Sequence, residues 1–318
     1  MRILNTIGTV FSAPAKNILE SMGTMDCVDI SQKQLLETLG EYDVLLVGIG
    51  LNIDREVLDR ATQLRVIATA TTGLDHIDVE YAKQKGIEVL SLRGEEEFLN
   101  TITATAELAF GLMLSLARHI PAAVDSVKNY VWDREQFRGH TLNGKTLGII
   151  GLGRLGKMMA RYGMGFGMNV IACDPNQDKK VFDEMGVTQV SFDELVQQSD
   201  VISIHVHLTP HTQNMFSESV FQKMKPGSLL INTSRGKIVN EADVLSALKN
   251  KIIGGYATDV LADEIGFQKV FDVHPLVEYA KKYSNLLIVP HIGGMTYESR
   301  EATDVFIAKK LANWIKSS

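Results

Sequence analysis

The sequence is poor in cysteine and in concentrated positive charge. Its 318 residues contain only two cysteines, Cys27 and Cys173, and 32 Lys and Arg residues stand against 38 Asp and Glu residues. Two distant cysteines provide neither a disulfide framework nor the spacing of a metal site, which is typical of a reducing compartment. Without a basic excess, nucleic-acid and membrane-surface partners are not expected. We therefore expect a cytoplasmic protein.

Long uninterrupted apolar segments are also missing. No stretch reaches the ~20 consecutive apolar residues that a membrane span needs. The first residues, MRILNTIGTVFSAP, contain one basic residue and no sustained apolar core, unlike an export signal. The chain is nevertheless 45% hydrophobic, and its length suits two domains better than one. These features predict a soluble two-domain protein with no membrane partner.

Short β-type runs alternate with amphipathic helical segments along most of the chain. In the first hundred residues we expect strands at 2–7, 26–30, 43–48, 65–70 and 87–92. From residue 145 on we expect strands at 145–150, 168–174, 200–206, 227–234, 252–260 and 285–291. A long apolar helix is expected at 103–120, where Pro121 interrupts it, and a closing helix at 298–318. The alternation predicts an α/β protein with two doubly wound parallel-sheet domains.

Residues 148–160, GIIGLGRLGKMMA, place four glycines where an expected strand passes into an expected helix. Gly151, Gly153 and Gly156 have the GxGxxG spacing, and this strand-turn-helix context is typical of a dinucleotide-binding turn. A backbone without Cβ atoms can approach a pyrophosphate at the positive end of the helix. Asp174 ends the next expected strand, about 20 residues further on, where a carboxylate meets the adenosine ribose and repels a 2′-phosphate. NAD is therefore expected rather than NADP.

Charged side chains follow the later strands of the second set. Arg235 comes after strand 227–234, Asp259 and then Glu264 come at the end of strand 252–260, and His291 ends strand 285–291. Because ligands bind beyond the carboxyl ends of such strands, these side chains should lie near the nucleotide. An arginine binds a carboxylate in bidentate fashion, and an imidazole beside a carboxylate moves a proton near neutral pH. The set indicates chemistry on a carboxylated carbonyl compound, although each residue alone has a structural alternative.

Several segments resemble the successive signatures of the D-isomer-specific 2-hydroxyacid dehydrogenase family. They are LGIIGLGRLG, INTSRGKIVNEADVLSAL, ATDV followed by Glu264, PHIGGMTYESR and, in the first domain, ATTGLDHIDVEYAKQKGIEV. The resemblance runs from about residue 43 to the end of the chain. It implies hydride transfer between NADH and a 2-keto acid, with His291 as general acid/base, Glu264 as its partner and Arg235 as the substrate-binding residue.

The resemblance also implies a domain organisation and an assembly. A Rossmann cofactor domain, residues 101–294, would be inserted in a flavodoxin-like substrate domain made of residues 1–100 and 295–318. The apolar segment 103–120 is similar to the dimer-forming region of the family, so a homodimer is expected. The implied cofactor contacts are Gly151, Gly153, Arg154, Leu155, Gly156, Asp174, Pro175, Thr233, Ser234, Asp259 and Gly293.

On the substrate side, the resemblance implies contacts from Thr72 and Gly73 in addition to Arg235. The segment SLRGEEEFLN contributes Arg93, which is either a second contact for an anionic substrate group or part of a solvated charge run. Phosphoglycerate dehydrogenases, which this chain resembles, carry an arginine-bearing motif after the strand that corresponds to 43–48. Here no basic residue follows that strand before Arg55, so the resemblance makes phosphoglycerate a less attractive substrate.

Two further features depart from the family pattern. Glu264 is followed by Ile265, where proline is common, and by a long loop. His205 and His207 would share one face of strand 200–206, near His211, which raises the alternative of a metal site. No cysteine or carboxylate joins these histidines, and we expect no metal.

Two alternative functions stay open. One is a phosphoglycerate or glyoxylate/hydroxypyruvate reductase, which differs only in substrate. The other is a non-catalytic NAD-sensing protein, similar to the co-repressors that share this fold. The sequence contains no disordered tail or additional partner-binding segment, which favours the enzyme.

Overall fold

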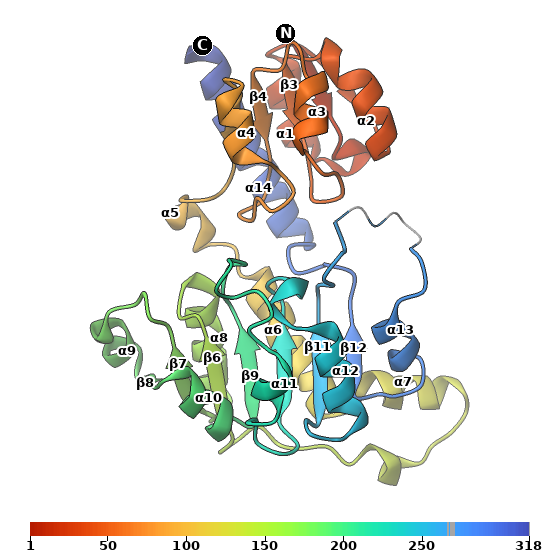
Figure 1. Ribbon diagram of the computed structural model, residues 1–318, viewed down its shortest axis with the longest axis vertical. Helices are drawn as coiled ribbons and strands as arrows, with labels where there is room; N and C mark the ends of the chain where they lie inside the picture. The colour runs from red at the N-terminus through yellow and green to blue at the C-terminus, as the bar shows by residue number, and fades with distance from the viewer. Residues whose placement is uncertain (266, 268–270, 318) are drawn as a thin grey trace. The chain divides into compact units, whose positions relative to one another are not determined.

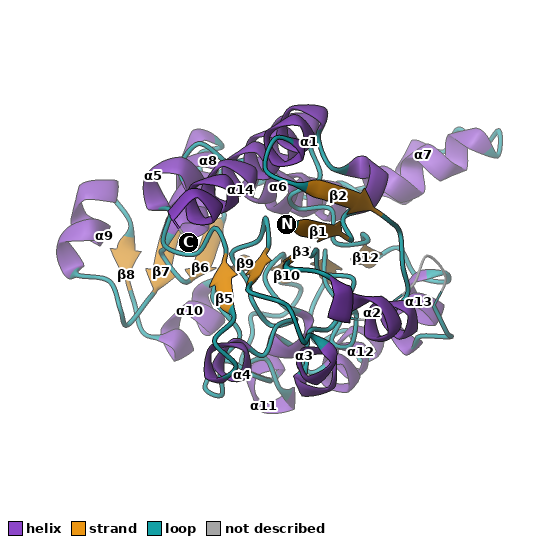
Figure 2. Cartoon of the chain, turned by 90° about the horizontal axis from the view of Figure 1, so that it is seen from above, coloured by secondary structure: helices purple, strands orange, loops and turns teal. Residues whose placement is uncertain are grey.

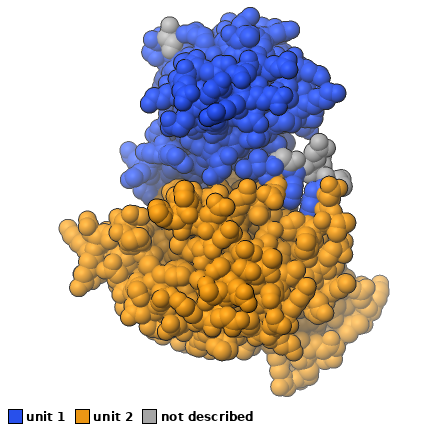
Figure 3. Space-filling view, viewed as in Figure 1, with its two compact units in different colours: residues 1–102, 265–271, 295–318 blue, residues 103–264, 272–294 orange. Residues whose placement is uncertain are grey.

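The computed structural model describes residues 1–265, 267 and 271–317. The chain forms two compact units, coloured separately in Figure 3. Unit 1 comprises Met1–Ile102, Ile265–Phe271 and Met295–Ser318, and unit 2 comprises Thr103–Glu264 and Asp272–Gly294. Segment 265–271, which the sequence interpretation kept in the second domain, is thus grouped with unit 1. Each unit contains one sheet, and every strand pair between named strands of the described chain is parallel. The predicted fold class is confirmed.

The sheet of unit 1 has the order β2-β1-β3-β4-β5, which is the flavodoxin-like arrangement. Its strands are β1 (Arg2–Asn5), β2 (Thr24–Cys27), β3 (Val44–Leu46), β4 (Val66–Ala68) and β5 (Glu88–Leu90). Its helices are α1 (Ala13–Glu20), α2 (Gln32–Thr38), α3 (Arg55–Arg60), α4 (Val79–Gln84), α5 (Glu96–Leu99) and α14 (Tyr297–Ser317). The prediction of 26–30 for the second strand was wrong by two residues at its start and by three at its end. As an edge strand, β2 is only partly buried, so it lacks the apolar run that marks the others.

Successive residues of the unit 1 strands point to opposite faces, and each face has its own hydrophobic cluster. Ile3 and Val44 pack with α1 and α14 on one face, whereas Leu4 and Leu45 pack with α2, α3 and α4 on the other. Figure 2 shows these two groups of helices on either side of the strands. A strand that is apolar on both faces reads as a continuous apolar run, because helices cover both sides of a parallel sheet.

The sheet of unit 2 has the order β12-β11-β10-β9-β6-β7-β8. Its strands are β6 (Thr146–Ile150), β7 (Asn169–Cys173), β8 (Thr188–Gln189), β9 (Val201–Ile204), β10 (Leu229–Asn232), β11 (Gly255–Thr258) and β12 (Leu286–Ile288). The chain builds outward from β6 to β8 and then, from β9, in the opposite direction, so the strand order reverses between β6 and β9. In doubly wound folds the ligand crevice lies at this point.

Helices cover both faces of the unit 2 sheet (Figure 1). Helices α6 and α8 pack on one face, and α10, α12 and α13 pack on the other. The helices of this unit are α6 (Ala104–Ala117), α7 (Ile120–Lys128), α8 (Arg154–Gly165), α9 (Lys179–Met185), α10 (Phe192–Gln198), α11 (Glu218–Phe221), α12 (Glu241–Lys249) and α13 (Pro275–Ala280).

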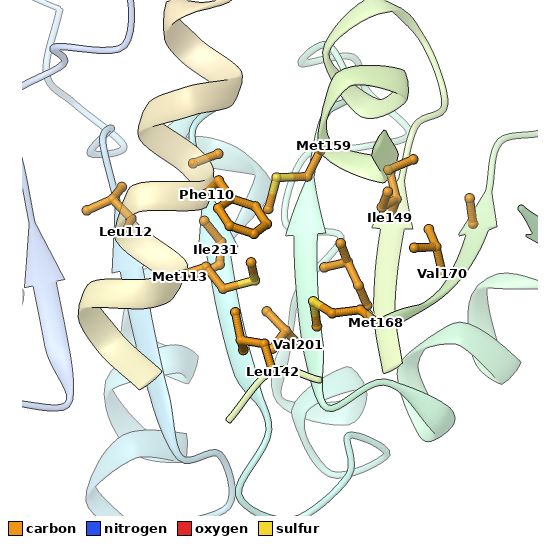
Figure 4. Packing of buried hydrophobic residues seen from close by; sticks show 14 of the residues in the cluster. Phe110, Leu112, Met113, Leu142, Ile149, Met159, Met168, Val170, Val201 and Ile231 are labelled. Carbon is orange, nitrogen blue, oxygen red and sulfur yellow. The ribbon is translucent and has the colours of Figure 1, made fainter. Parts of the chain in front are cut away.

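Helix α6 forms the centre of the unit 2 core. Phe110 and Met113 pack with Ile149, Met159 and Ile231 (Figure 4). By length and composition alone, the stretch Glu96–Ala117 could also cross a membrane. In the structure, α6 buries its apolar side chains against the sheet of its own unit, which accounts for its composition.

The expected helix break at Pro121 was wrong. The apolar helix ends earlier, and His119 adopts a left-handed backbone conformation with φ 53°. Pro121 lies in the first turn of the next helix, α7, where its missing N–H removes no helical hydrogen bond.

Candidate active site

The glycine-rich turn lies between β6 and α8, beside the reversal point of the unit 2 sheet. Gly151 has φ +88°, and a Cβ atom there would lie 2.5 Å from the carbonyl oxygen of His205. A Cβ atom on Gly156 would collide with the carbonyl oxygen of Gly151. By contrast, a Cβ atom on Gly153 would meet no atom of the described chain within 4 Å. The fold itself therefore requires two of the glycines, whereas the third leaves open space in front of the first turn of α8.

Asp174 follows β7 directly and joins the glycine turn to the next loop. Its Oδ2 accepts a hydrogen bond from the Leu152 amide at 2.8 Å, and its Oδ1 accepts one from the Asn176 amide at 2.9 Å. Pro175, between them, is exposed. The carboxylate is thus fixed at the carboxyl end of β7, next to the turn, where the sequence analysis expected the ribose contact.

Arg154 and Leu155 begin α8, immediately after the turn. Burial lowers the pKa of the Arg154 guanidinium, which still remains charged near neutral pH because the ordinary pKa of arginine is very high. The first turn of a twelve-residue helix also presents unpaired amides and the positive end of the helix dipole. Together these groups suit a pyrophosphate.

Two buried polar atoms next to the reversal point test whether a dinucleotide fits. Thr233 Oγ1, after β10, and His205 Nδ1, after β9, have no hydrogen-bond partner among the described residues. In native proteins, buried polar atoms are rarely left without a hydrogen-bond partner. Their position at the two strand ends, together with the open space at Gly153, fits a bound NAD molecule. The Ser234 hydroxyl instead donates to the Ile204 carbonyl at 2.8 Å and ties the two strand ends together.

His205 is an uncharged residue of this edge. Burial lowers its pKa to about 4, and its Nε2 lies 2.8 Å from the Ser203 hydroxyl. The expectation that His205 and His207 share a strand face was wrong, because β9 ends at Ile204 and His207 is exposed in the following loop. Among the residues that the structure describes, no group of three His, Cys, Asp or Glu side chains is arranged to hold a metal ion.

Arg235 follows β10 in a loop that a buried asparagine organises. The Asn232 side chain donates to the Arg235 carbonyl at 2.9 Å and accepts from the Ser234 amide at 3.0 Å. The backbone of Leu261 and the following residue fills the space where a Cβ atom on Gly236 would lie. The loop that carries Arg235 therefore packs directly on the loop that follows β11.

Glu264 and His291 form a hydrogen-bonded pair. His291 Nδ1 lies 2.8 Å from Glu264 Oε1, and both side chains are mostly buried. With Nδ1 engaged by the carboxylate, Nε2 is the ring nitrogen that is placed to exchange a proton with a ligand. His291 has φ 51°, a left-handed conformation that costs a non-glycine residue free energy and needs support from its surroundings.

Asp259 provides that support. Its carboxylate accepts hydrogen bonds from the amides of Ile292 at 2.6 Å and Gly293 at 2.8 Å, and its carbonyl accepts one from the His291 amide at 2.9 Å. The side chain is only 2% exposed, and burial raises the pKa of Asp259 to about 6. A Cβ atom on Gly293 would lie 2.9 Å from Asp259 Oδ2, so glycine permits the close approach. The sequence analysis expected Asp259 among the cofactor contacts and did not anticipate its role as a clamp on the His291 turn, because no local pattern links positions 259 and 292.

The substrate contacts expected from the first domain lie at the carboxyl ends of β4 and β5 in unit 1. Thr71 Oγ1 donates to the Gly73 carbonyl at 2.8 Å, and the Leu92 amide donates to the Thr71 carbonyl at 3.0 Å. Arg93 is exposed, and its Nε lies 3.4 Å from the Thr72 carbonyl oxygen. The three expected residues of this unit, Thr72, Gly73 and Arg93, are therefore brought together.

Comparisons with known proteins match this architecture. The model of the D-isomer specific 2-hydroxyacid dehydrogenase NAD-binding domain matches residues 110–293. Glyoxylate reductase of Thermococcus litoralis is 37% identical over 289 residues, which are 89% of this chain and 83% of that protein. D-3-phosphoglycerate dehydrogenase of Methanocaldococcus jannaschii is 36% identical over 93% of this chain, which spans only 54% of that relative. The solved D-lactate dehydrogenase of Aquifex aeolicus, complexed with NAD and lactic acid, has a TM-score of 0.88 at 28% identity and covers 100% of this chain and 96% of its own.

These matches settle the class of protein, one with an NAD-binding Rossmann domain. The chain belongs to the D-isomer-specific 2-hydroxyacid dehydrogenase family. The predicted family and the predicted cofactor, NAD, are confirmed.

Proposed function

We propose that the protein is an NAD-dependent D-2-hydroxyacid dehydrogenase that interconverts a 2-keto acid and a D-2-hydroxy acid. The observation that carries the proposal is the 2.8 Å Glu264–His291 pair in the unit that also contains the glycine turn and the Arg235 loop. An acid/base imidazole, a fixed carboxylate partner and a carboxylate-binding guanidinium are the groups that this reaction needs.

The proposed roles follow from the charges. Bound NADH supplies the hydride for C2 of the keto acid. Protonated His291 donates its Nε2 proton to the oxygen on C2 as negative charge develops there, and in the reverse direction His291 is the base. Glu264 holds the ring and stabilises its charged form. Arg235 binds the substrate carboxylate and fixes the orientation of the carbonyl group.

Two loops of unit 1 are also proposed to bind substrate. We propose that backbone amides at Thr72 and Gly73 contact the substrate and that Arg93 contacts an anionic or polar group further along it. Support comes from the way the loops after β4 and β5 are joined, which places the Arg93 guanidinium over the Thr72 carbonyl. The names of relatives support glyoxylate, hydroxypyruvate and phosphoglycerate as alternative substrate types.

A homodimer is also proposed, with a second copy of the chain covering α7. Ile120, Val124 and Val127 on this helix are between 45% and 50% exposed, and Trp132 just beyond it is 88% exposed. An apolar group of this size on one short helix favours a protein partner. Helix α6, within the expected dimer region 103–120, buries eight of its 14 residues in its own unit, so the proposed contact extends to the following helix. Substitution of Val124 and Trp132 by glutamate and serine should convert the dimer to a monomer in sedimentation experiments.

The location is proposed to be the cytoplasm, without nucleic-acid or membrane partners. Both cysteines are free thiols, and the formal net charge is −6. Within the stretch Glu96–Ala117, which is long and apolar enough for a membrane, residues from Ala109 to Ala117 pack in the core of unit 2.

The proposed activity is tested by NADH oxidation with a panel of 2-keto acids that includes glyoxylate, pyruvate, hydroxypyruvate, a phosphorylated keto acid and a keto dicarboxylate. We expect turnover with at least one of them and a raised KM in Arg235→Ala. Lys249→Ala, which removes an exposed cation at the end of α12, serves as the matched control. Tight NADH binding without turnover of any keto acid would favour the non-catalytic NAD-sensing alternative.

A further inference from the structure

The carboxylate of Glu241 contacts the chain on both sides of segment 265–271, which directly follows Glu264. Glu241 is the first residue of α12, and its Oε1 accepts a hydrogen bond from the Ala262 amide at 2.8 Å. Its Oε2 lies 3.2 Å from Nε2 of His274, on the far side of segment 265–271. The chain leaves unit 2 after Glu264 and returns at Asp272, so Glu241 joins the two points where the segment departs and returns.

His274 is held through both ring nitrogens. Its Nδ1 accepts a hydrogen bond from the Leu276 amide at 3.3 Å and so caps the start of α13. Because Nδ1 is an acceptor, Nε2 carries the hydrogen and donates to Glu241. Glu241 and His274 are mostly buried, and they connect the first turns of α12 and α13. The bridge is therefore part of the packed unit and not an exposed ion pair.

The Ala262 amide is two residues away from the proposed acid/base pair. Glu264 Oε2 accepts a hydrogen bond from the Leu261 amide at 3.3 Å, and Glu264 Oε1 bonds to His291 at 2.8 Å. The Leu261 and Ala262 backbone also packs against Gly236, next to Arg235. A shift of Ala262 would thus move the Glu264 carboxylate relative to the imidazole.

We propose that Glu241 is a positioning residue, which fixes the Glu264 carboxylate against His291 by holding the Ala262 amide; the inference rests on the proposed function. A charged acceptor makes a stronger hydrogen bond to an amide than a neutral one does. Displacements of about 1 Å in a catalytic arrangement can reduce turnover by ~10²-fold. The contact with His274 Nε2 keeps the same carboxylate in place.

Four variants separate positioning from a general structural role. Glu241→Ala removes both bonds, whereas Glu241→Gln keeps an acceptor for the Ala262 amide. His274→Asn retains a side chain that can cap α13 but loses the bond to Glu241. Glu278→Gln is the matched control, because Glu278 lies on α13 and forms an ion pair with Lys281, just beyond the end of that helix. Each variant is compared with the wild-type protein for kcat, KM, NADH affinity, melting temperature and the ¹⁵N shifts of the His291 ring.

In Glu241→Ala we expect kcat to fall by about 10- to 100-fold, the usual effect of losing a group that orients a catalytic side chain. NADH affinity and KM should change little. The ¹⁵N shifts of the His291 ring should change, because a displaced Glu264 carboxylate no longer contacts Nδ1 in the same geometry. Glu241→Gln should recover most of the turnover, and His274→Asn should lie between them.

Wild-type kcat and unchanged His291 ring shifts in Glu241→Ala would overturn the proposal, as would a loss of turnover that parallels a loss of NADH affinity. If Glu241→Ala does not fold, Glu241→Gln and His274→Asn provide the same comparison. The His291 ring shifts need no turnover. If the wild-type protein reduces no keto acid, the proposed function fails, while altered His291 shifts in Glu241→Ala, absent in Glu278→Gln, would still support the positioning role.

Discussion

The two sheets of this protein share one architecture but differ at their carboxyl edges. In unit 2 this edge carries the buried carboxylate of Asp259, the neutral imidazole of His205 and the Glu264–His291 pair. In unit 1 the same edge carries threonine hydroxyls, backbone groups and one exposed guanidinium, Arg93. The parallel sheet thus provides a place for a site, and the residues after the strands decide its chemistry.

Buried carboxylates occur in both units, and their partners separate two roles. Burial raises the pKa of Asp259 and of Asp304. Asp304, in α14 of unit 1, accepts the Ser12 amide at 3.0 Å and so joins α14 to the start of α1, a role in packing. Asp259 holds the turn that presents an imidazole. A displaced pKa alone is therefore weak evidence for a site, and the group that the carboxylate orients is the stronger evidence.

The largest effect should come from removing the imidazole of unit 2. His291→Asn should lower kcat by about 10²- to 10⁴-fold, the usual loss for a general acid/base. NADH affinity should persist, because the glycine turn and Asp174 are untouched. Stopped-flow turnover and NADH fluorescence titration measure the two quantities. His140→Asn, at an exposed histidine ahead of β6, is the control, and near-normal turnover in His291→Asn would contradict the assigned role.

A second comparison lies within the glycine turn. Gly151→Ala places a Cβ atom against the His205 carbonyl at φ +88°, and such backbone strain costs about 1–3 kcal/mol. Its melting temperature should fall. Gly153→Ala meets no atom of the described chain and should keep the melting temperature while weakening NADH binding. Calorimetry and NADH titration distinguish the two variants. Equal NADH affinity in Gly153→Ala and wild-type protein would show that the open space does not receive the nucleotide.

Asp259 and His205 should give opposite dependences of stability on pH. The pKa of Asp259 is raised from 3.8 to about 6, so its contribution to stability is complete below pH 3.8 and is lost as pH rises to 6. The pKa of His205 is lowered from 6.5 to about 4, so its contribution is present above pH 6.5 and is lost as pH falls to 4. Each contribution is on the order of 1–3 kcal/mol.

Asp259→Asn should therefore make the melting temperature rise more steeply between pH 4 and 6, whereas His205→Gln should make it rise less steeply. Differential scanning calorimetry across this range measures both slopes. Asp193→Asn, at an exposed carboxylate on α10, is the matched control. Parallel slopes in the two site variants would mean that burial does not displace the two groups in opposite directions.

The parts of the site that follow local rules were predictable from the sequence. The turn at Gly151 and Gly153, the carboxylate of Asp174 and the strand-end positions of Arg235 and His291 depend on spacing and on the order of elements. The alternation of elements likewise gave the two parallel sheets, because helices on both faces of a sheet require continuous apolar strands.

Long-range contacts were not predictable in this way. The Asp259 clamp and the Glu241 bridge each join residues more than twenty positions apart, and no periodic pattern marks them. The edge strand β8 has two residues and no apolar run, so its existence follows only from pairing with β7. The break before α7 depends on His119, whose left-handed backbone conformation is not indicated by helix propensity. Pro121 does not mark the break, because proline is tolerated in a first helical turn.

The smallest effect should come from the unit 1 edge. Arg93→Ala removes an exposed side chain that contacts the Thr72 carbonyl at 3.4 Å, so stability should change by less than about 0.5 kcal/mol. If Arg93 contacts the substrate, the variant should lose kcat/KM for keto acids with a second anionic group and keep it for pyruvate, because only the former present a charge to the guanidinium. Arg60→Ala, at the end of α3 in the same unit, is the control.

A uniform loss for all keto acids would instead assign Arg93 to the Thr72 loop, since that loop would then be displaced for every substrate. If Arg93→Ala leaves kcat/KM unchanged for every keto acid, Arg93 belongs to the solvated charge run, and the unit 1 edge offers backbone groups alone.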